Sequence, residues 1–205
     1  KPKDWRDLVG VPMTEARPRI ALMMAAFEPR KRHAAFLRAF AKAAHKAPDM
    51  KVLLAGQGPD EQEIRNLVSA LGLQDRVVFC GHRPDPEGLL ALADLLVLTS
   101  EREGLPRVVI QALASAVPVV VNEVPGICEV IQSGRNGIVV PPHDVSRAVD
   151  QMIDLIKSDS DLDQLVLGSL DTDISDWELD HLGACTTRLY QRTANNQVDV
   201  VVLAE

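Results

Sequence analysis

The stretch 93-ADLLVLTSEREGLPRVVIQALASAVPVVV-121 decides the fold of this chain. Its apolar run LLVL does not alternate with polar residues, which is typical of a parallel strand covered on both faces. A helical pattern follows, with Pro106 in its first turn, and Pro118 ends that helix and begins a second buried strand. The polar turn that contains Glu103 and Gly104 therefore lies at the carboxyl end of a strand, where open α/β sheets bind ligands.

The rest of the chain repeats this alternation of strand and helix. Expected strands lie at 20–27, 50–55, 76–80, 95–98, 119–121 and 138–140. Expected helices lie at 34–47, from about 60 to 71, at 86–92, from about 105 to 117, at 127–131 and at 145–157. The pattern predicts an α/β fold with a Rossmann-like, doubly wound parallel sheet of about six strands.

The chain is expected to contain one principal domain, since 205 residues suit a single sizeable core. Residues 1–18 are interpreted as a lead-in or linker and residues 19–171 as the domain itself. Residues 172–205 are interpreted as a C-terminal helix, at about 177–190, and an apolar tail at 198–203 with no evident partner. The first residue is Lys1 rather than Met, which predicts a piece of a longer protein.

Residues 100–121 resemble the donor-site signature of the family 4 (group 1) retaining glycosyltransferases, S-x-x-E-G-x-x-x-x-x-x-E-A-x-A-x-G-x-P-V-V. The resemblance runs from about residue 19 to residue 157. It implies the donor-binding half of a GT-B architecture, in which a UDP- or GDP-linked sugar is transferred to an acceptor hydroxyl with retention. It also implies that no metal or other cofactor is required.

The same resemblance implies a partner, because the family places an acceptor-binding domain before this one. That domain would be N-terminal in a longer parent protein or would be supplied by a separate chain. The isolated fragment is therefore expected to be inactive. Two alternatives remain open. One is a module that binds a nucleotide-sugar without turning it over. The other is an unrelated α/β protein such as an NAD enzyme, which is disfavoured because Glu61 occupies the place of the third glycine in the dinucleotide fingerprint.

The signature supplies the first candidate site residues. Glu103 matches its first glutamate, which implies binding of sugar hydroxyls, whereas Gln111 replaces the second, which the family uses to bind ribose. Gly104 permits close approach of a ligand, and the free N–H groups of the helix that begins near Leu105 favour an anion. Together they predict a site for a nucleoside diphosphate.

The basic loop after the first strand supplies the second set. Lys31 aligns with the lysine of the family's G-R-x-x-x-x-K diphosphate loop, and with Glu103 it is a candidate catalytic residue. The arginine of that pattern falls on Ala26, so that Arg30 or Arg32 is the candidate substitute. A solvated basic turn before a helix is the alternative interpretation.

Three further pairs follow other strands and complete the donor-binding candidates: Gly56 and Gly58, His82 and Arg83, Gly126 and Glu129. The first pair is interpreted as a tight turn of a kind that is common in the family. In the second pair, the arginine can stack on a base, although a solvated surface pair is the alternative. The third pair matches the family pattern G-G-x-x-E, although its glutamate also suits a helix-surface charge.

The charge distribution argues against nucleic acid as a partner. Residues 1–60 contain 12 Lys and Arg against 6 Asp and Glu, although the whole chain has a net charge of −7. These positive charges are interleaved with apolar helix positions and lack interspersed aromatic residues. Repeated D-x-D spacings within 158–180 are interpreted as a solvated acidic segment, so no metal site is predicted.

The cysteines point to a reducing compartment. Cys80, Cys128 and Cys185 are odd in number and form no C-x-x-C pair, so that neither a disulfide framework nor a zinc site is indicated. The sequence contains no apolar run of about 18 residues and no signal sequence. A cytoplasmic location is expected, with peripheral attachment to the inner face of a membrane through the missing domain left open.

Overall fold

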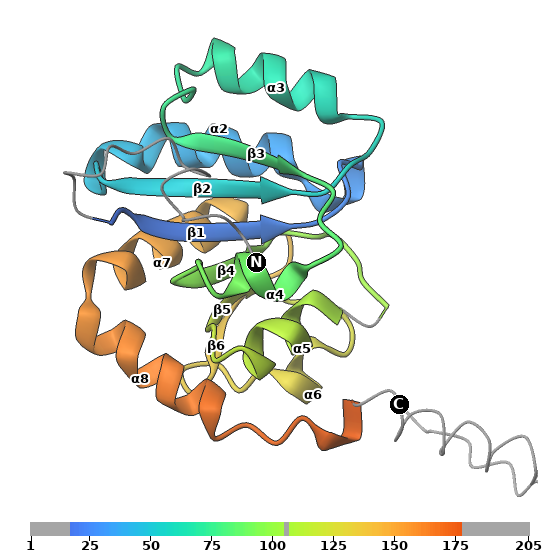
Figure 1. Ribbon diagram of the computed structural model, residues 1–205, viewed down its shortest axis with the longest axis vertical. Coiled ribbons are helices and arrows are strands. Elements are labelled where there is room, and N and C mark those ends of the chain that lie inside the picture. Colours follow the sequence, from blue (N-terminus) through green and yellow to red (C-terminus); the bar gives the residue numbers. More distant parts are fainter. Residues whose placement is uncertain (1–16, 105–106, 178–205) are drawn as a thin grey trace, which may run out of the picture. The chain divides into compact units, whose positions relative to one another are not determined.

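A six-stranded parallel sheet organises the computed structural model, which describes residues 17–104 and 107–177 (Figure 1). Its strands are β1 Arg19–Met24, β2 Met50–Ala55, β3 Val77–Gly81, β4 Leu95–Leu98, β5 Val119–Asn122 and β6 Gly137–Val140. They are ordered β3-β2-β1-β4-β5-β6, and every neighbouring pair is parallel. This is the doubly wound Rossmann order, so the predicted fold class is confirmed.

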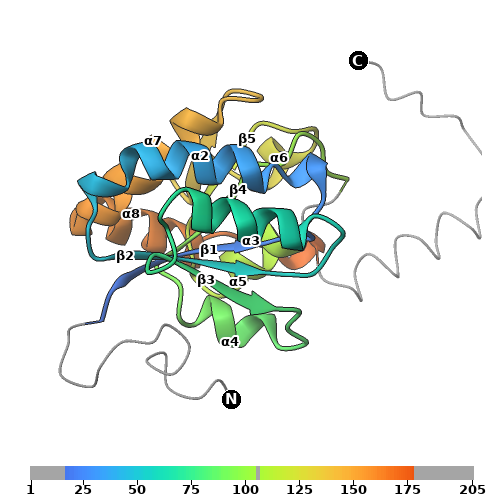
Figure 2. The same cartoon turned by 90° about the horizontal axis from the view of Figure 1, so that it is seen from above.

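Helices cover both faces of this sheet, with α2 and α7 on one face and α4 and α5 on the other (Figure 2). The longer helices are α2 His33–Ala43, α3 Glu61–Ala70, α5 Arg107–Ala114, α7 Val145–Lys157 and α8 Asp159–Leu170. The shorter elements are α4 Pro86–Leu90, α6 Ile127–Val130 and the 3-10 turns η1 Pro29–Lys31, η2 Ala44–Lys46 and η3 Ser175–Trp177. Because both faces are covered, the strands read as continuous apolar runs.

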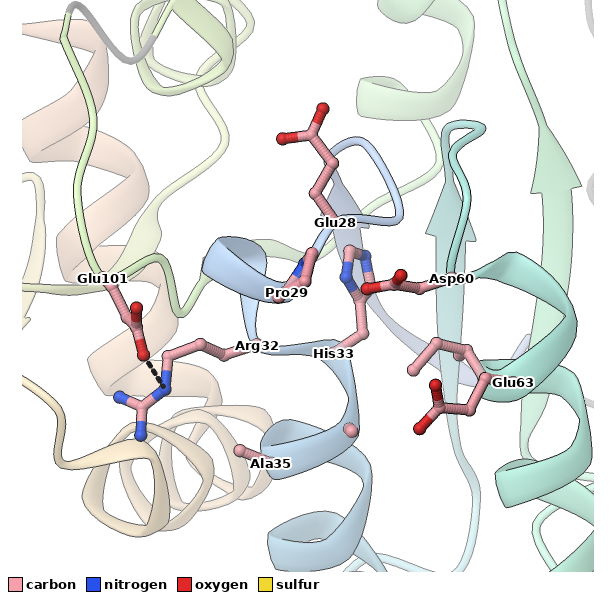
Figure 3. Close-up of a pocket in the computed structure, with 10 residues that line it drawn as sticks. Glu28, Pro29, Arg32, His33, Ala35, Asp60, Glu63 and Glu101 are labelled. Carbon is pink, nitrogen blue, oxygen red and sulfur yellow. Dashed lines mark ion pairs between the residues drawn. The ribbon is translucent and has the colours of Figure 1, made fainter.

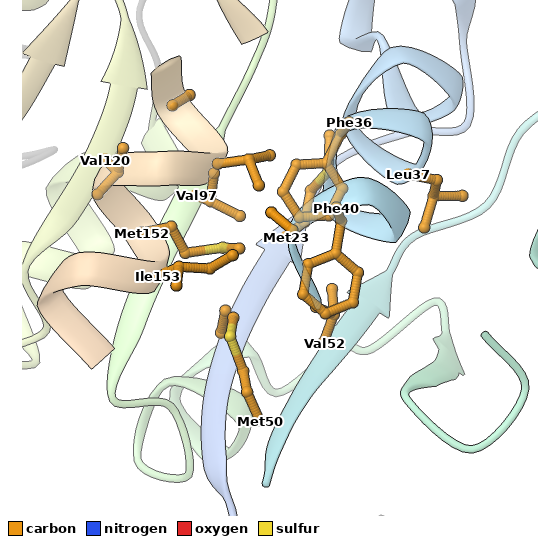
Figure 4. Close-up of a cluster of buried hydrophobic side chains, with 14 of the residues drawn as sticks. Met23, Phe36, Leu37, Phe40, Met50, Val52, Val97, Val120, Met152 and Ile153 are labelled. Atoms are coloured by element: carbon orange, nitrogen blue, oxygen red, sulfur yellow. The ribbon is translucent and has the colours of Figure 1, made fainter. Parts of the chain in front are cut away.

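The core beneath α2 and α7 is built from aromatic and branched side chains (Figure 4). Phe36 and Phe40 lie one turn apart on α2, and their rings stack with centroids 6.1 Å apart. They pack over Met23 of β1, while Met152 and Ile153 of α7 enter the same cluster. Full burial of such side chains stabilises the fold by about 1.5–3 kcal/mol each, which fixes the helices over the sheet.

The first strand is shorter than predicted. We expected it to extend to residue 27, but β1 ends at Met24. Beyond this point the Ala25 amide still donates to the Ala55 carbonyl at the end of β2 at 2.9 Å, and the Phe27 amide donates to the Gln57 carbonyl in the turn after β2 at 3.1 Å. The strand ends where its neighbour ends, since Met24 pairs with Ala55, the last residue of β2.

The segment after residue 157, which was interpreted as a solvated acidic segment, forms helix α8, and its aspartates are exposed. Ser158 caps this helix by accepting a hydrogen bond from the Asp161 amide at 3.4 Å. Leu162 and Leu165 are buried against the core, one helical turn apart. The aspartates therefore occupy the first turn and the exposed face of an amphipathic helix, and the acidic first turn suits the positive end of the helix dipole.

The end of α5 contains a non-glycine residue in the left-handed conformation. Ala116 has φ 56°, and its amide donates to the Leu113 carbonyl at 2.9 Å. The Val117 amide donates to the Ala112 carbonyl at 2.8 Å, which completes a Schellman motif. The glycine of the family signature aligns with Ala116. In this chain an alanine therefore adopts a left-handed conformation that glycine adopts more readily.

The chain falls into two compact units, residues 1–172 and 173–205, and η3 belongs to the second. Most of the predicted lead-in, the predicted helix at 177–190 beyond its first residue, and the apolar tail lie outside the described residues. Within the described ranges, no helix combines the length and apolar character that a membrane span requires.

Candidate functional site

The candidate site lies where the strand order reverses, between β1 and β4. The loops that leave these two neighbouring strands are joined to one another: the Glu101 amide donates to the Arg30 carbonyl at 2.9 Å, and the Thr99 hydroxyl donates to the Lys31 carbonyl at 3.2 Å. In doubly wound sheets the crevice at this switch point is where ligands bind.

Lys31 and Glu103 meet at this junction. The Lys31 ammonium contacts one Glu103 carboxylate oxygen, and the two side chains are only 12% and 9% exposed. The Arg30 guanidinium lies 3.7 Å from the other oxygen and donates through Nε to Glu28 at 2.7 Å. The structure thus brings together both residues that the sequence suggested as catalytic, with two cations around one carboxylate.

Arg30 and Arg32 take different directions, although the sequence left both as substitutes for the arginine missing at Ala26. Arg30 reaches the Glu103 carboxylate. Arg32 has φ 60° and points toward Glu101, with 3.7 Å between the charged groups (Figure 3). Of the two, Arg30 is the one that shares a site with Lys31.

Gly56 and Gly58 lie against the backbone of the loop after β1. A Cβ added at Gly56, which has φ 151°, would lie 2.1 Å from the Ala25 carbonyl oxygen. One added at Gly58 would lie 2.4 Å from the Phe27 carbonyl oxygen. Any side chain at these positions would clash with the loop that carries Lys31, so the close approach of the two backbones requires glycine at both.

Sequence reasoning missed His33, the first residue of α2. Its imidazole is buried against the Phe27 ring at a centroid distance of 4.7 Å, and neither ring nitrogen has a hydrogen-bond partner among the described residues. Burial, and secondarily the nearby Lys31 charge, lowers the His33 pKa from 6.5 to about 4. Its position, three and seven residues before Phe36 and Phe40 on the helix stripe, is the signal that predicts burial.

A cavity of about 350 Å³ opens between the start of α2 and the start of α3 (Figure 3). It is lined by His33 and by several acidic side chains that include Glu28, Asp60, Glu63 and Glu101. Asp60 is the N-cap residue of α3 and Glu63 lies in its first turn, where carboxylates suit the helix dipole. The cavity thus lies beside the loop that carries Lys31, but its acidic lining does not favour a phosphate.

The loops after β4 and β5 also approach one another. A Cβ added at Gly126, which has φ 79°, would lie 3.9 Å from the Gly104 carbonyl oxygen, whereas one added at Gly104 would meet no described atom within 4 Å. Packing therefore does not require a glycine at position 104.

Beside this contact is a second cavity of about 440 Å³, lined by Glu123, Val124, Pro125, Gly126, Cys128, Glu129 and Pro142. Leu105, the remaining candidate in this loop, lies outside the described residues.

The other candidates lie on the surface near the same edge of the sheet. Gln111 is exposed on α5, opposite the face that buries Val109 and Leu113, so it is not a core glutamine. His82 is exposed after β3. Arg83 donates through Nε and Nη2 to the two oxygens of Asp85 at 3.0 Å each, and these bonds lower the Asp85 pKa. The Arg83 guanidinium is thus already paired with the Asp85 carboxylate.

Metal-ligating and redox groups are dispersed. In the part of the chain that the structure describes, no three His, Cys, Asp or Glu side chains are placed to hold a metal ion. Asp159, a member of the D-x-D spacings, forms an ion pair with Arg19 of β1. Cys80 and Cys128 are free thiols, and burial raises the Cys80 pKa to about 11; Cys185 lies outside the described residues.

Comparison with known proteins identifies a family for this chain. The sequence profile of the family described as "Glycosyl transferases group 1" matches residues 12–166. N-acetyl-alpha-D-glucosaminyl L-malate synthase from Bacillus anthracis is 38% identical over 141 residues, which are 69% of this chain and 37% of that protein.

Solved structures share the fold at low sequence identity. The crystal structure of HepE from Anabaena in complex with UDP and glucose superposes with a TM-score of 0.76 at 22% identity, covering 93% of this chain and 51% of the other. The C-terminal domain of a group 1 family protein (LpcC) from Francisella tularensis superposes with a TM-score of 0.70 at 20% identity, covering 78% and 87%. The chain thus spans well under two thirds of the full-length relatives and most of one isolated C-terminal domain.

Proposed function

The chain belongs to the group 1 glycosyl transferase family, and from this we propose that it is the donor-binding half of a retaining glycosyltransferase with a GT-B architecture. The donor would be a UDP- or GDP-linked sugar. The observation that carries the proposal is the convergence of Lys31, Arg30 and Glu103 from the loops of β1 and β4 at the switch point of the sheet. Cations placed there suit a diphosphate, and a carboxylate beside them suits sugar hydroxyls.

In the proposed reaction Lys31 and Arg30 stabilise the leaving diphosphate. The bond between the anomeric carbon and the phosphate oxygen breaks, and its electron pair goes to the diphosphate. The acceptor oxygen bonds to the same face of that carbon, and the hydroxyl proton passes to the departing phosphate oxygen. Charge already fixed beside the departing group lowers the barrier because no reorganisation is needed at the moment of reaction. The proposed transfer requires no bound metal.

The nucleoside would lie along α5. Gln111, which is exposed, would bind the ribose hydroxyls, accepting a hydrogen bond from one through its carbonyl and donating to the other through its amide. His82 and Arg83 after β3 are the proposed contacts to the base, and Gly104, Gly126 and Glu129 are the proposed contacts near the sugar.

The acceptor would be held by a second domain. The chain covers only 37% and 51% of two full-length relatives, which supports a division of the work between two domains. A site that excludes water during transfer needs groups from both sides of the cleft. We therefore expect the isolated chain to bind the diphosphate weakly and to transfer no sugar.

A second candidate function is a nucleotide-sugar-binding module without activity of its own. It is favoured by Ala26, which replaces the arginine of the family's diphosphate loop, and by Gln111, which replaces the second glutamate. The two candidates differ only in turnover. When the chain is joined to its acceptor-binding domain, release of sugar from the donor supports the enzyme, and stable binding without release supports the module.

Isothermal titration calorimetry with UDP and GDP tests the donor site that both candidates share. A hydrogen bond to a charged group is worth roughly 1.5–3 kcal/mol, so Lys31→Ala should weaken binding of the preferred diphosphate by about 10-fold or more. It should leave binding of the bare nucleoside unchanged. Lys46→Ala is the matched control, because Lys46 is 47% exposed and paired with Asp150 away from the site. Equal losses for diphosphate and nucleoside would place the phosphate elsewhere.

A further inference from the structure

The loops that carry Lys31 and Glu103 are joined by two hydrogen bonds in addition to this ion pair. The backbone bond from Glu101 to Arg30 and the hydroxyl bond from Thr99 to Lys31 already join them. The ion pair is nevertheless largely excluded from water, and Arg30 lies at the second carboxylate oxygen. In this position the Glu103 carboxylate pairs with the Lys31 ammonium, which the proposed donor site would otherwise offer to a phosphate.

We propose that this ion pair is a latch that makes the affinity for a diphosphate depend on the sugar attached to it. The inference rests on the proposed donor site and concerns the regulation of that site. A bare diphosphate has to displace the Glu103 carboxylate from Lys31, and it then lies beside a carboxylate with little access to solvent. Like charges at such short range oppose each other strongly where water is excluded.

A sugar-linked diphosphate meets a different site. Its sugar hydroxyls donate hydrogen bonds to the Glu103 carboxylate, which can only accept them, and so replace the bond that Lys31 withdraws. Lys31 is then released to the phosphates. After the sugar has left, the remaining diphosphate carries no such hydroxyls, and Lys31 returns to Glu103. The latch therefore favours capture of the complete donor and release of the spent nucleotide.

The test compares two carboxylates of the same loop. Glu103→Gln removes the latch, whereas Glu101→Gln removes the same charge from a side chain that pairs with Arg32 instead. The first probe is inorganic pyrophosphate, which is independent of base and sugar. By calorimetry Glu103→Gln should bind pyrophosphate about 10-fold more tightly than the wild-type chain, and Glu101→Gln should stay within about 2-fold.

A second probe tests the dependence on the sugar. UDP-glucose, UDP-N-acetylglucosamine and GDP-mannose are compared with UDP and GDP on the same variants. Glu103→Gln should lose the preference for the sugar-linked nucleotide over the bare one, since the first exchanges a charged hydroxyl acceptor for a weaker neutral one and the second gains a free Lys31. Glu103→Asp, which keeps the charge but withdraws it by one methylene, provides a second variant with a smaller gain for pyrophosphate.

Three results with pyrophosphate would each overturn the latch. The first is an affinity for pyrophosphate that neither Glu103→Gln nor Glu103→Asp changes. The second is an affinity for pyrophosphate that Glu101→Gln raises as much as Glu103→Gln does. The third is a gain from Glu103→Gln that persists in a Lys31→Ala background, because coupled residues must show non-additive effects. Failure of the proposed function is distinguishable: the wild-type chain would bind none of the nucleotide-sugars, whatever its response to pyrophosphate.

Discussion

Replacing Ala116 by glycine is expected to stabilise this protein. The residue has φ 56° at the end of α5, and the left-handed conformation costs an L-residue with a Cβ roughly 1–2 kcal/mol. Glycine avoids that cost, but it gains about 0.5–1 kcal/mol of conformational freedom in the unfolded chain. The difference predicts an increase in the free energy of unfolding of about 0.5–1 kcal/mol for Ala116→Gly.

Urea unfolding followed by circular dichroism measures this change, provided that the slope of the transition is unaltered. Ala114→Gly is the matched control, since Ala114 is the exposed last residue of the same helix. There glycine brings its entropic cost without relieving strain, and it should lower the free energy of unfolding by up to about 1 kcal/mol. The same chemical change, two positions apart, should therefore have opposite signs. If Ala116→Gly destabilises the protein as Ala114→Gly does, the left-handed turn does not strain the alanine.

Other perturbations address the candidate site and its support. Gln111→Glu should raise affinity for UDP about five-fold, or on the order of 1 kcal/mol, but not for the 2′-deoxy analogue; calorimetry on both ligands checks this, and equal effects would remove Gln111 from the ribose. His33→Phe should flatten the acid dependence of stability. The His33 pKa is about 4 in the folded chain and 6.5 in the unfolded chain, so between pH 7.5 and pH 5 the unfolded chain binds a proton more tightly. Over this range the wild-type chain should therefore lose about 2 kcal/mol of its free energy of unfolding, which the variant should retain. Urea titrations at the two pH values measure it, with the same change at exposed His45 as control; a matching loss in His33→Phe would contradict the burial argument. Gly58→Ala should lower the melting temperature, because its methyl group meets the Phe27 carbonyl, whereas Gly104→Ala should leave the melting temperature unchanged and weaken diphosphate binding. Equal melting temperatures for the two alanine variants would refute the packing assigned to Gly58.

The sheet was predictable because its strands are buried on both faces. Runs such as Leu95–Leu98 carry no alternation and lie between helical stripes, so the number of strands and their parallel arrangement follow from general rules of α/β folds. Helix α8 was not recognised, because the alternating aspartates of its first turn dominate the segment and its buried positions are few. The spacing of Leu162 and Leu165 after a Ser158 cap was the available signal.

The candidate site was predictable only at the level of loops. Parallel strands bring their carboxyl ends to one edge, which placed Lys31 and Glu103 in the same region. Their contact depends on the course of two irregular loops and on the left-handed turn at Arg32, which no periodicity reveals. The choice between Arg30 and Arg32 likewise required side-chain directions, since the two residues are two positions apart in a turn.

The central position of β1 has a consequence for how the chain folds. Its ladder with β2 joins Ala21 to Val52, but its ladder with β4 joins Ala21 to Leu95, much farther along the chain. Closing the larger loop has the greater entropic cost and slows the search for the pairing. The half of the sheet formed by β1, β2 and β3 can therefore assemble before β4 arrives. Because Lys31 and Glu103 lie on opposite sides of this late pairing, we infer that the proposed diphosphate site is among the last parts of the fold to form.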